Sequence, residues 1–261
     1  MSARIGIINI MPRGEAYEPY LLAPLRAQPI PVEPVWIRLA SHAYHSADPA
    51  HLEANYRTFE DVIATAPLDG LILTGAPVEE LAFSEVRYFD ELSAILRYAR
   101  AHVPVTLGLC WGGMALGHLL GVGKRLFSKK LFGVFEERIV VPNDLTSGDA
   151  FLCAHSRHSG VVEADLERAV TDGVVRALSR GDHSGSSLFE SIDRRYIAHL
   201  GHPEYEADRI VFEWERDRQL GRADVNPPAG FDLTAPSTTW ASHRAQLFAG
   251  FVRRATLADG L

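Results

Sequence analysis

The chain has 261 residues, of which 47% are hydrophobic and 23% are charged, and its formal net charge at pH 7 is −7. This composition is that of an ordinary globular protein, and the acidic balance argues against a nucleic-acid partner. Its two cysteines exclude a disulfide framework, and its apolar segments are too short to span a membrane. The N-terminus lacks the pattern of a signal peptide, so we expect one domain, residues 1–261, in the reducing cytoplasm.

Short apolar segments alternate with longer amphipathic ones through the first half of the chain. We expect strands at residues 5–10, 32–39, 71–74 and 104–109, and helices at residues 15–26, 51–64, 90–101 and 112–120. Pro34 predicts a kink or an edge position for the second strand. This order predicts an α/β fold with a doubly wound, mostly parallel sheet and helices on both faces, whose ligands bind beyond the carboxyl ends of the strands.

The second half is less regular. Further strands are expected at residues 133–141, 150–154, 174–179 and 196–201, and helices at residues 207–219 and 240–256. A Pro- and Gly-rich loop, residues 221–237, separates these two helices. Because so long a loop is unusual in a compact domain, we expect it to cover the site or to bind a second copy of the chain.

The strand at residues 104–109 leads directly into Cys110, which stands in the sequence Gly-Leu-Cys-Trp-Gly. A nucleophile flanked by glycines between a strand and a helix is typical of a nucleophile elbow, whose sharp turn tolerates only small neighbours. Cys153 lies in an apolar segment and is interpreted as a buried structural residue.

Residues 201–205, Gly-His-Pro-Glu-Tyr, provide an imidazole and a carboxylate two positions apart. A histidine activates a thiol, and a carboxylate orients the histidine, so Cys110, His202 and Glu204 are the predicted catalytic residues. These residues alone leave hydrolase, amidotransferase and acyltransferase open. His155 and His158 lack a convincing third and fourth ligand, so no metal site is expected.

The chain resembles the homoserine O-acyltransferase family of methionine biosynthesis, of the type with a class I glutamine-amidotransferase-like fold. The resemblance rests on the Cys110 and His202 motifs and on six further segments that follow in the family's order. These are residues 8–12 (INIMP), 55–61 (NYRTFED), 69–77 (DGLILTGAP), 130–136 (KLFGVFE), 154–157 (AHSR) and 240–243 (WASH).

The resemblance implies a ping-pong transfer of an acyl group from a coenzyme A thioester to L-homoserine. In this interpretation Cys110 is the nucleophile, His202 the general base and Glu204 its orienting partner. Arg216 aligns with the arginine that holds the α-carboxylate of the substrate, a task suited to a guanidinium. Lys130 and Ser156 align with residues that line the pocket for the acyl and acceptor groups.

Glu79 occupies the position that separates acyl donors in this family. A glycine there accommodates the carboxylate of a succinyl group, whereas a glutamate fills the space and repels that charge. We therefore expect acetyl-CoA as the co-substrate, with succinyl-CoA as the alternative donor. Glu80 would exchange roles with Glu79 after a shift of one register position.

Several positions depart from the family pattern. Arg13 and Gly14 stand where the family has lysines, residues 15–20 replace a segment rich in Glu, Thr and Gln, and Gly113 replaces an alanine. We expect these changes to surround the acceptor, which leaves L-serine or a related hydroxy-amino acid as an alternative to homoserine.

Two other classes remain as alternatives. A glutamine amidotransferase or γ-glutamyl hydrolase shares the cysteine and histidine motifs, but Met114 stands where amidotransferases usually have glutamine. A non-catalytic protein that kept the fold is disfavoured by the intact Cys110, His202 and Glu204. The expected partners are small-molecule substrates and a second copy of the chain in a homodimer, and no cofactor is expected beyond the acyl-CoA.

Overall fold

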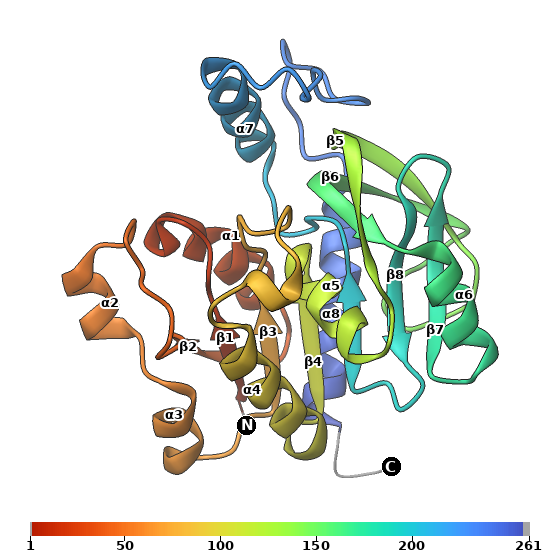
Figure 1. Ribbon diagram of the computed structural model, residues 1–261. Helices are drawn as coiled ribbons and strands as arrows, with labels where there is room; N and C mark the ends of the chain where they lie inside the picture. Colours follow the sequence, from red (N-terminus) through yellow and green to blue (C-terminus); the bar gives the residue numbers. More distant parts are fainter. Residues whose placement is uncertain (1, 258–261) are drawn as a thin grey trace.

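The computed structural model describes residues 2–257 of the chain, whose strands form one nine-stranded sheet with helices around it (Figure 1). The strands are β1 (Ala3–Ile8), β2 (Val32–Ile37), β3 (Gly70–Leu73), β4 (Val105–Leu109), β5 (Lys124–Ile139), β6 (Ala150–Val161), β7 (Val175–Gly181), β8 (Gly185–Ser191) and β9 (Tyr196–His199). The helices are α1 (Gly14–Arg26), α2 (Pro49–Asn55), α3 (Phe59–Thr65), α4 (Phe89–His102), α5 (Trp111–Leu119), α6 (Glu163–Thr171), α7 (Ala207–Gln219) and α8 (Ala241–Thr256). A short 3-10 helix, η1 (Phe83–Glu85), precedes α4.

The sheet has the strand order β2-β1-β3-β4-β9-β8-β7-β5-β6. The pairs from β2 to β9 are parallel, and those from β9 to β6 are antiparallel. The predicted doubly wound α/β fold is confirmed, and its parallel part contains all the strands expected in the first half. The expectation of a mostly parallel sheet is wrong, because four of the eight strand pairs among residues 2–257 are antiparallel. Strand β2 with Pro34 lies at the edge, as predicted, where a missing backbone N–H is tolerated.

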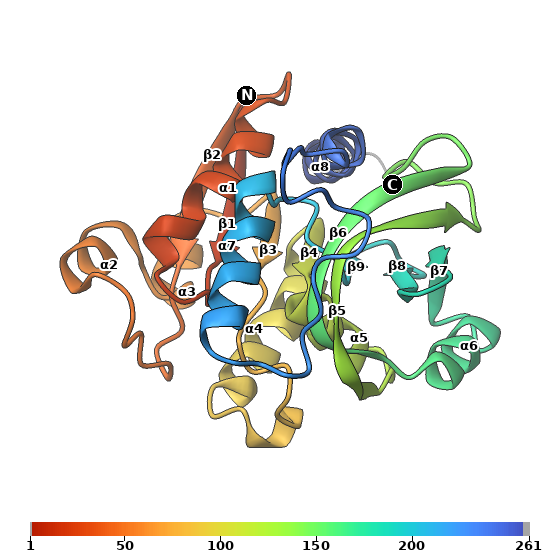
Figure 2. The same cartoon turned by 90° about the horizontal axis from the view of Figure 1, so that it is seen from above.

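The two faces of the parallel strands carry separate hydrophobic cores. Along β1, Ile5 and Ile7 pack with residues of α1 and α8, whereas Ile8 packs with residues of α4 and α5. In β3, Ile72 and Leu73 likewise belong to opposite cores, because successive side chains of a strand point to opposite faces. Figure 2 shows α1 and α8 on one face and α4 and α5 on the other.

Some predicted elements are wrong in their extent. The helix expected at residues 51–64 is two helices, because Tyr56 and Arg57 are extended and Arg57 forms a bridge with Ile37. Thr58 then begins α3 as its N-cap and accepts a hydrogen bond from the N–H of Asp61. Strands β5 and β6 begin or end well beyond the expected ranges, and α6 and β8 were not expected.

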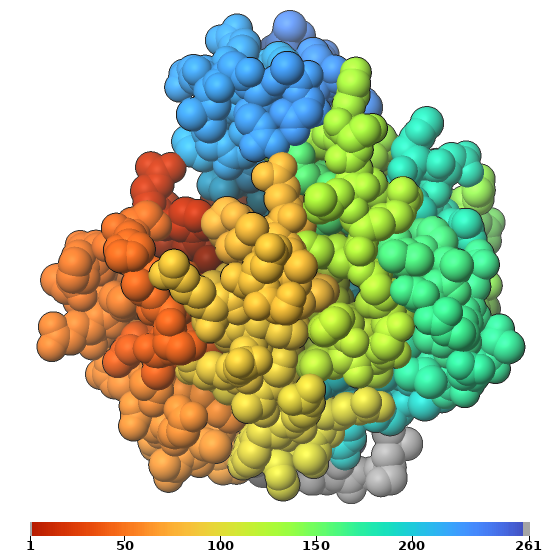
Figure 3. Space-filling model, viewed as in Figure 1, coloured from red at the N-terminus to blue at the C-terminus, as the bar shows by residue number. Residues whose placement is uncertain are grey.

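Helix α7 lies above the carboxyl ends of the parallel strands, with a recess beneath it (Figure 3). The loop that follows α7 pairs with β5: the N–H of Lys130 donates to Asp224 O at 2.9 Å and the N–H of Ala229 to Phe132 O at 2.9 Å. Gly133 permits this approach, since its φ is 134° and a Cβ would lie 2.1 Å from Ala229 O. The loop therefore covers the upper part of β5.

Candidate active site

Cys110 lies between β4 and α5 with φ 51° and ψ −112°, a strained conformation for a residue with a side chain. The glycines after it allow the start of α5 to approach the sheet. A Cβ on Gly112 would lie 2.5 Å from Leu73 O, and one on Gly113 would lie 2.8 Å from His199 O. Gly113 therefore packs against β9 and is not among the residues that line the cavity in front of Cys110.

His202 lies in the loop just after β9, which ends at His199, and its side chain faces Cys110. A Cβ built on Gly75 would lie 3.5 Å from both Cys110 Cβ and His202 Cε1, so the two side chains converge in front of the loop after β3. His202 Nδ1 lies 2.7 Å from Glu204 Oε1, and both residues are buried. Burial opposes a charged imidazole, but the charges of Cys110 and Glu204 raise the pKa of His202 well above its usual value.

A cavity of about 350 Å³ opens in front of Cys110 and His202. It also brings together the other sequence-predicted residues, Glu79, Lys130, Ser156 and Arg216. Glu204 does not line this cavity, because it lies behind the His202 ring. The remaining lining residues come mainly from α7, from the loop after β1 and from the loop after β3.

Glu213 of α7 is the site residue that sequence reasoning missed. Its carboxylate accepts hydrogen bonds from Ser156 Oγ, from Tyr205 OH at 2.8 Å and from Arg209 Nε at 3.2 Å, and it lies 3.4 Å from Lys130 Nζ. Burial opposes its ionisation, yet Lys130 and Arg209 lower the pKa of Glu213 to about 2. Glu213 is thus ionised in the cavity wall, where it is paired with Lys130 and Arg209.

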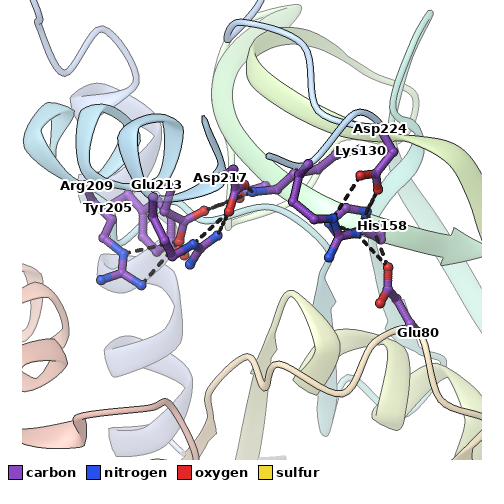
Figure 4. A network of polar contacts seen from close by, with 11 residues as sticks. Glu80, Lys130, His158, Tyr205, Arg209, Glu213, Asp217 and Asp224 are labelled. Carbon is purple, nitrogen blue, oxygen red and sulfur yellow. Dashed lines mark hydrogen bonds and ion pairs between the residues drawn. The ribbon is translucent and has the colours of Figure 1, made fainter. Parts of the chain in front are cut away.

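Lys130 and Ser156 contact acidic side chains of α7. Lys130 Nζ lies 2.7 Å from Asp217 Oδ2, and its side chain is only 3% exposed. Figure 4 shows Lys130 between α7 and the cluster at Glu80. Arg216 remains 41% exposed at the cavity wall, where its Nε donates to Asp217 Oδ1 at 2.7 Å. Arg216 and Glu213 are three residues apart, so they lie on one face of α7. This spacing is the feature of the sequence that could have indicated Glu213 as a site residue.

Glu79 is the less exposed member of the glutamate pair, since it is half-buried whereas Glu80 is exposed. Burial raises the pKa of Glu79 to about 7, although a backbone hydrogen bond and the charge of Lys130 act against the increase. One of its carboxylate oxygens, Oε2, is buried without a hydrogen-bond partner among residues 2–257. Glu80 instead points to the rim and contacts Arg222 Nη2 at 3.0 Å. Both glutamates line the cavity, and the assignment of donor selection to Glu79 stays a prediction.

Arg13 and Gly14 stand where lysines are expected in the family, and of these two residues only Arg13 lines the cavity. Its guanidinium lies 5.5 Å from the centroid of the Phe212 ring on α7. Gly14 instead begins α1 and faces Asn9, whose Nδ2 would lie 2.9 Å from a Cβ there. Gly14 is therefore not among the residues that line this cavity.

Two clusters of potential metal ligands occur in the described part of the chain. Cys153, His199 and His243 are fully buried. His199 Nδ1 accepts from the N–H of Gly201 at 3.0 Å, so its Nε2 carries the proton and donates to His243 Nε2 at 2.9 Å. These hydrogen bonds use both ring nitrogens of His199 and Nε2 of His243, while His243 Nδ1 has no partner among residues 2–257.

The second cluster, Glu80, His158 and Asp224, surrounds a guanidinium (Figure 4). Arg222 Nη2 lies 2.7 Å from Asp224 Oδ2 and 3.4 Å from His158 Nε2. These contacts join the loop after α7 to the loop after β3 at the rim of the cavity.

The sequence matches a known protein family over nearly the whole of the described region. The pattern of the homoserine O-succinyltransferase family matches residues 2–256. A homoserine O-acetyltransferase of Geobacillus kaustophilus is 38% identical over 254 residues, which cover 94% of this chain and 83% of the relative. One from Bacillus licheniformis is 37% identical over 254 residues, covering 94% and 82%.

Solved structures with this fold are more distant in sequence. A putative GMP synthase component from Thermoplasma acidophilum has a TM-score of 0.60 at 14% identity, covering 99% of this chain and 96% of that one. A glutamine amidotransferase from Thermotoga maritima has a TM-score of 0.57 at 14% identity, covering 99% and 98%. They share the amidotransferase-like fold. Between residues 2 and 257, no helix has the length and apolar character needed to span a bilayer.

Proposed function

Because the chain belongs to the homoserine O-succinyltransferase family, we propose that it transfers an acyl group from coenzyme A to the hydroxyl of L-homoserine through an acyl-Cys110 intermediate. One observation carries this proposal. The cavity that exposes Cys110 and His202 is also lined by the ionised Glu213 and by Arg216. A carboxylate and a guanidinium on one helix face match the ammonium and carboxylate groups of an α-amino acid.

In the first half-reaction, the Cys110 thiolate attacks the thioester carbonyl, and the carbon–sulfur bond to coenzyme A then breaks. The thiol of coenzyme A leaves with a proton from the His202 imidazolium, whose charge Glu204 stabilises at 2.7 Å. The N–H of Trp111 at the first position of α5 is suited to the oxyanion, because N–H groups at a helix start have no intrahelical acceptor.

In the second half-reaction, His202 takes the proton of the homoserine hydroxyl as its oxygen attacks the acyl-Cys110 carbonyl. The carbon–sulfur bond to Cys110 breaks, the O-acyl ester leaves, and the thiolate and imidazolium are restored. Glu213 and Arg216 hold the amino-acid end during this step, so the hydroxyl approaches from the α7 side of the cavity.

We assign acetyl-CoA as the donor because Glu79 occupies the cavity and one of its oxygens has no partner among residues 2–257. A succinyl carboxylate near this side chain would lose its water and meet a group that is ionised in part of the molecules at pH 7. No metal or further cofactor takes part in the proposed steps. The resemblance to the family also favours a homodimer, which light scattering would test.

The test follows the release of coenzyme A from acetyl-CoA or succinyl-CoA, with L-homoserine, with L-serine and without an acceptor. The proposal predicts fast turnover only with acetyl-CoA and homoserine, and parallel double-reciprocal lines when both substrates are varied. Fast turnover with L-serine would contradict the assignment of homoserine as the acceptor. Fast turnover with succinyl-CoA would contradict the assignment of acetyl-CoA as the donor. Glutaminase activity without any acyl transfer would favour the amidotransferase alternative.

A further inference from the structure

Tyr17 on α1 contacts the Glu204 carboxylate and does not itself line the cavity. Its hydroxyl donates a hydrogen bond to Glu204 Oε1, the same oxygen that lies 2.7 Å from His202 Nδ1. Burial and the charge of Glu204 raise the pKa of Tyr17 well above its usual value, so the hydroxyl stays protonated and acts as a donor. Tyr17 is only 1% exposed.

Glu204 has few other partners. It is fully buried, and its second oxygen, Oε2, has no hydrogen-bond partner among residues 2–257. Its two donors are therefore His202 and Tyr17. A buried carboxylate with so few donors is costly to keep ionised, and each donor that remains has a large effect on its charge and its orientation.

The surroundings fix the Tyr17 ring in place. It meets the Tyr205 ring edge-on, with centroids 6.2 Å apart, and Tyr205 in turn stacks on His202. The guanidinium of Arg209 lies 5.7 Å from the Tyr17 ring centroid. Tyr17 thus belongs to a packed aromatic cluster that includes the His202 ring.

We propose that Tyr17 is a positioning residue that keeps Glu204 Oε1 aimed at His202 Nδ1, so that the imidazole stays oriented toward Cys110. The expected effect on kcat rests on the proposed function. The expected effect on the alkylation of Cys110 does not. Tyr17 lies in residues 15–20, the segment expected from the sequence to depart from the family pattern.

The test compares Tyr17→Phe with Tyr20→Phe. The first variant keeps the ring and removes only the hydroxyl that reaches Glu204. Tyr20 is the matched control, because it belongs to the same aromatic cluster but its hydroxyl donates to exposed Asp208, at 3.2 Å. The readout is the rate of Cys110 alkylation by iodoacetamide as a function of pH, followed by mass spectrometry. This reaction requires the thiolate but no acyl-CoA or acceptor.

For Tyr17→Phe, we expect the midpoint of the alkylation profile to move up by about one pH unit, and kcat to fall about 10-fold, since a hydrogen bond to a charged group is lost. Tyr20→Phe should match the wild type in both. In a Glu204→Gln background, Tyr17→Phe should add less than about 2-fold to the loss of kcat, because the tyrosine acts through the carboxylate.

A wild-type alkylation profile in Tyr17→Phe, with an unchanged melting temperature, would overturn the inference. So would an equal effect of Tyr17→Phe with and without Glu204, because the tyrosine would then act elsewhere. If the alkylation profile shifts as expected but the wild type does not transfer acyl groups, the proposed function fails and the positioning role stands.

Discussion

The Tyr205 ring stacks on the His202 imidazole, with ring centroids 4.0 Å apart and planes inclined by 18°. The hydroxyl of the same tyrosine donates to Glu213 Oε1 at 2.8 Å. One side chain therefore connects the catalytic base with the carboxylate of the proposed acceptor site. Tyr205 can therefore affect catalysis in two ways: its ring contacts His202, and its hydroxyl contacts the carboxylate of Glu213.

Tyr205→Phe should keep the stack on His202 but remove a donor from Glu213. We expect acylation by acetyl-CoA to change little and KM for homoserine to rise about 10-fold, the loss associated with a hydrogen bond to a charged group. Tyr205→Leu also removes the ring and should slow both half-reactions. Rapid-quench measurement of each half-reaction checks this, and equal effects of the two variants would contradict the assignment of the ring to His202.

Glu213→Gln should separate the two half-reactions more sharply. The variant removes the buried negative charge that faces the ammonium group, so we expect kcat/KM for homoserine to fall about 100-fold. The burst of coenzyme A release on mixing with acetyl-CoA should remain within about 3-fold of the wild type. Exposed Glu215 on the same helix provides the control Glu215→Gln. Equal loss of both half-reactions in Glu213→Gln would remove Glu213 from the acceptor site.

Because Glu79 lines the cavity, we predict that the preference for acetyl-CoA over succinyl-CoA depends on pH. Because its pKa is about 7, the charge that repels succinyl-CoA is largely lost at pH 6 and nearly complete at pH 8. The ratio of kcat/KM for succinyl-CoA to that for acetyl-CoA should therefore rise as the pH falls. Glu79→Gln should make this ratio independent of pH, and Glu79→Gly should raise it further by providing space. A constant ratio in the wild type would mean that volume alone excludes succinyl-CoA.

The same residue predicts a pH dependence of stability. The folded pKa of Glu79 lies above its unfolded value of 4.5, so the folded state binds more protons, and its contribution to stability falls as the pH rises from 4.5 to 7. Glu79→Gln should therefore gain free energy of unfolding relative to the wild type over this range, by up to about 3 kcal/mol. Urea unfolding at pH 5 and pH 8 measures the difference, and a difference of the opposite sign would contradict the buried position.

Gly133→Ala should release the loop after α7 from β5. The new Cβ would lie 2.1 Å from Ala229 O at a φ of 134°, so we expect destabilisation of about 2–4 kcal/mol and faster proteolysis within residues 221–237. Gly173→Ala is the matched control, since Gly173 also has a positive φ, of 69°, but nothing lies within 4 Å of its Cβ position. Equal losses in both variants would show that only backbone strain, and not the contact with the loop, matters at Gly133.

The features of the site that the sequence predicted are local or lie at strand ends. Cys110 stands in a short motif at the end of β4, and His202 and Glu204 follow β9, so a parallel sheet necessarily brings them to one edge. The α/β fold itself followed from the alternation of apolar strands and amphipathic helices. Strand ends and short motifs can be located from the local sequence, without knowing how distant segments pack.

Glu213 and Tyr17 could not be predicted in the same way, because each acquires its role from a distant partner. Glu213 lies in a highly charged helix, and only the approach of Lys130 and Ser156 from β5 and β6 makes its carboxylate a buried group. Tyr17 meets Glu204 only after α1 packs beneath the loop that follows β9. The single helix predicted at residues 51–64 failed for the same reason, since the bridge from Arg57 to Ile37 interrupts a helical pattern.

The most direct test of the account is the mass of the intact protein after mixing with acetyl-CoA in the absence of an acceptor. The account predicts one acetyl group per chain, located on Cys110 by peptide mapping, lost on addition of homoserine and absent from Cys110→Ala. Cys153→Ala should acquire the group as the wild type does, because Cys153 is fully buried and does not line the cavity. An unmodified Cys110 together with continued formation of O-acetylhomoserine would contradict the acyl-enzyme mechanism.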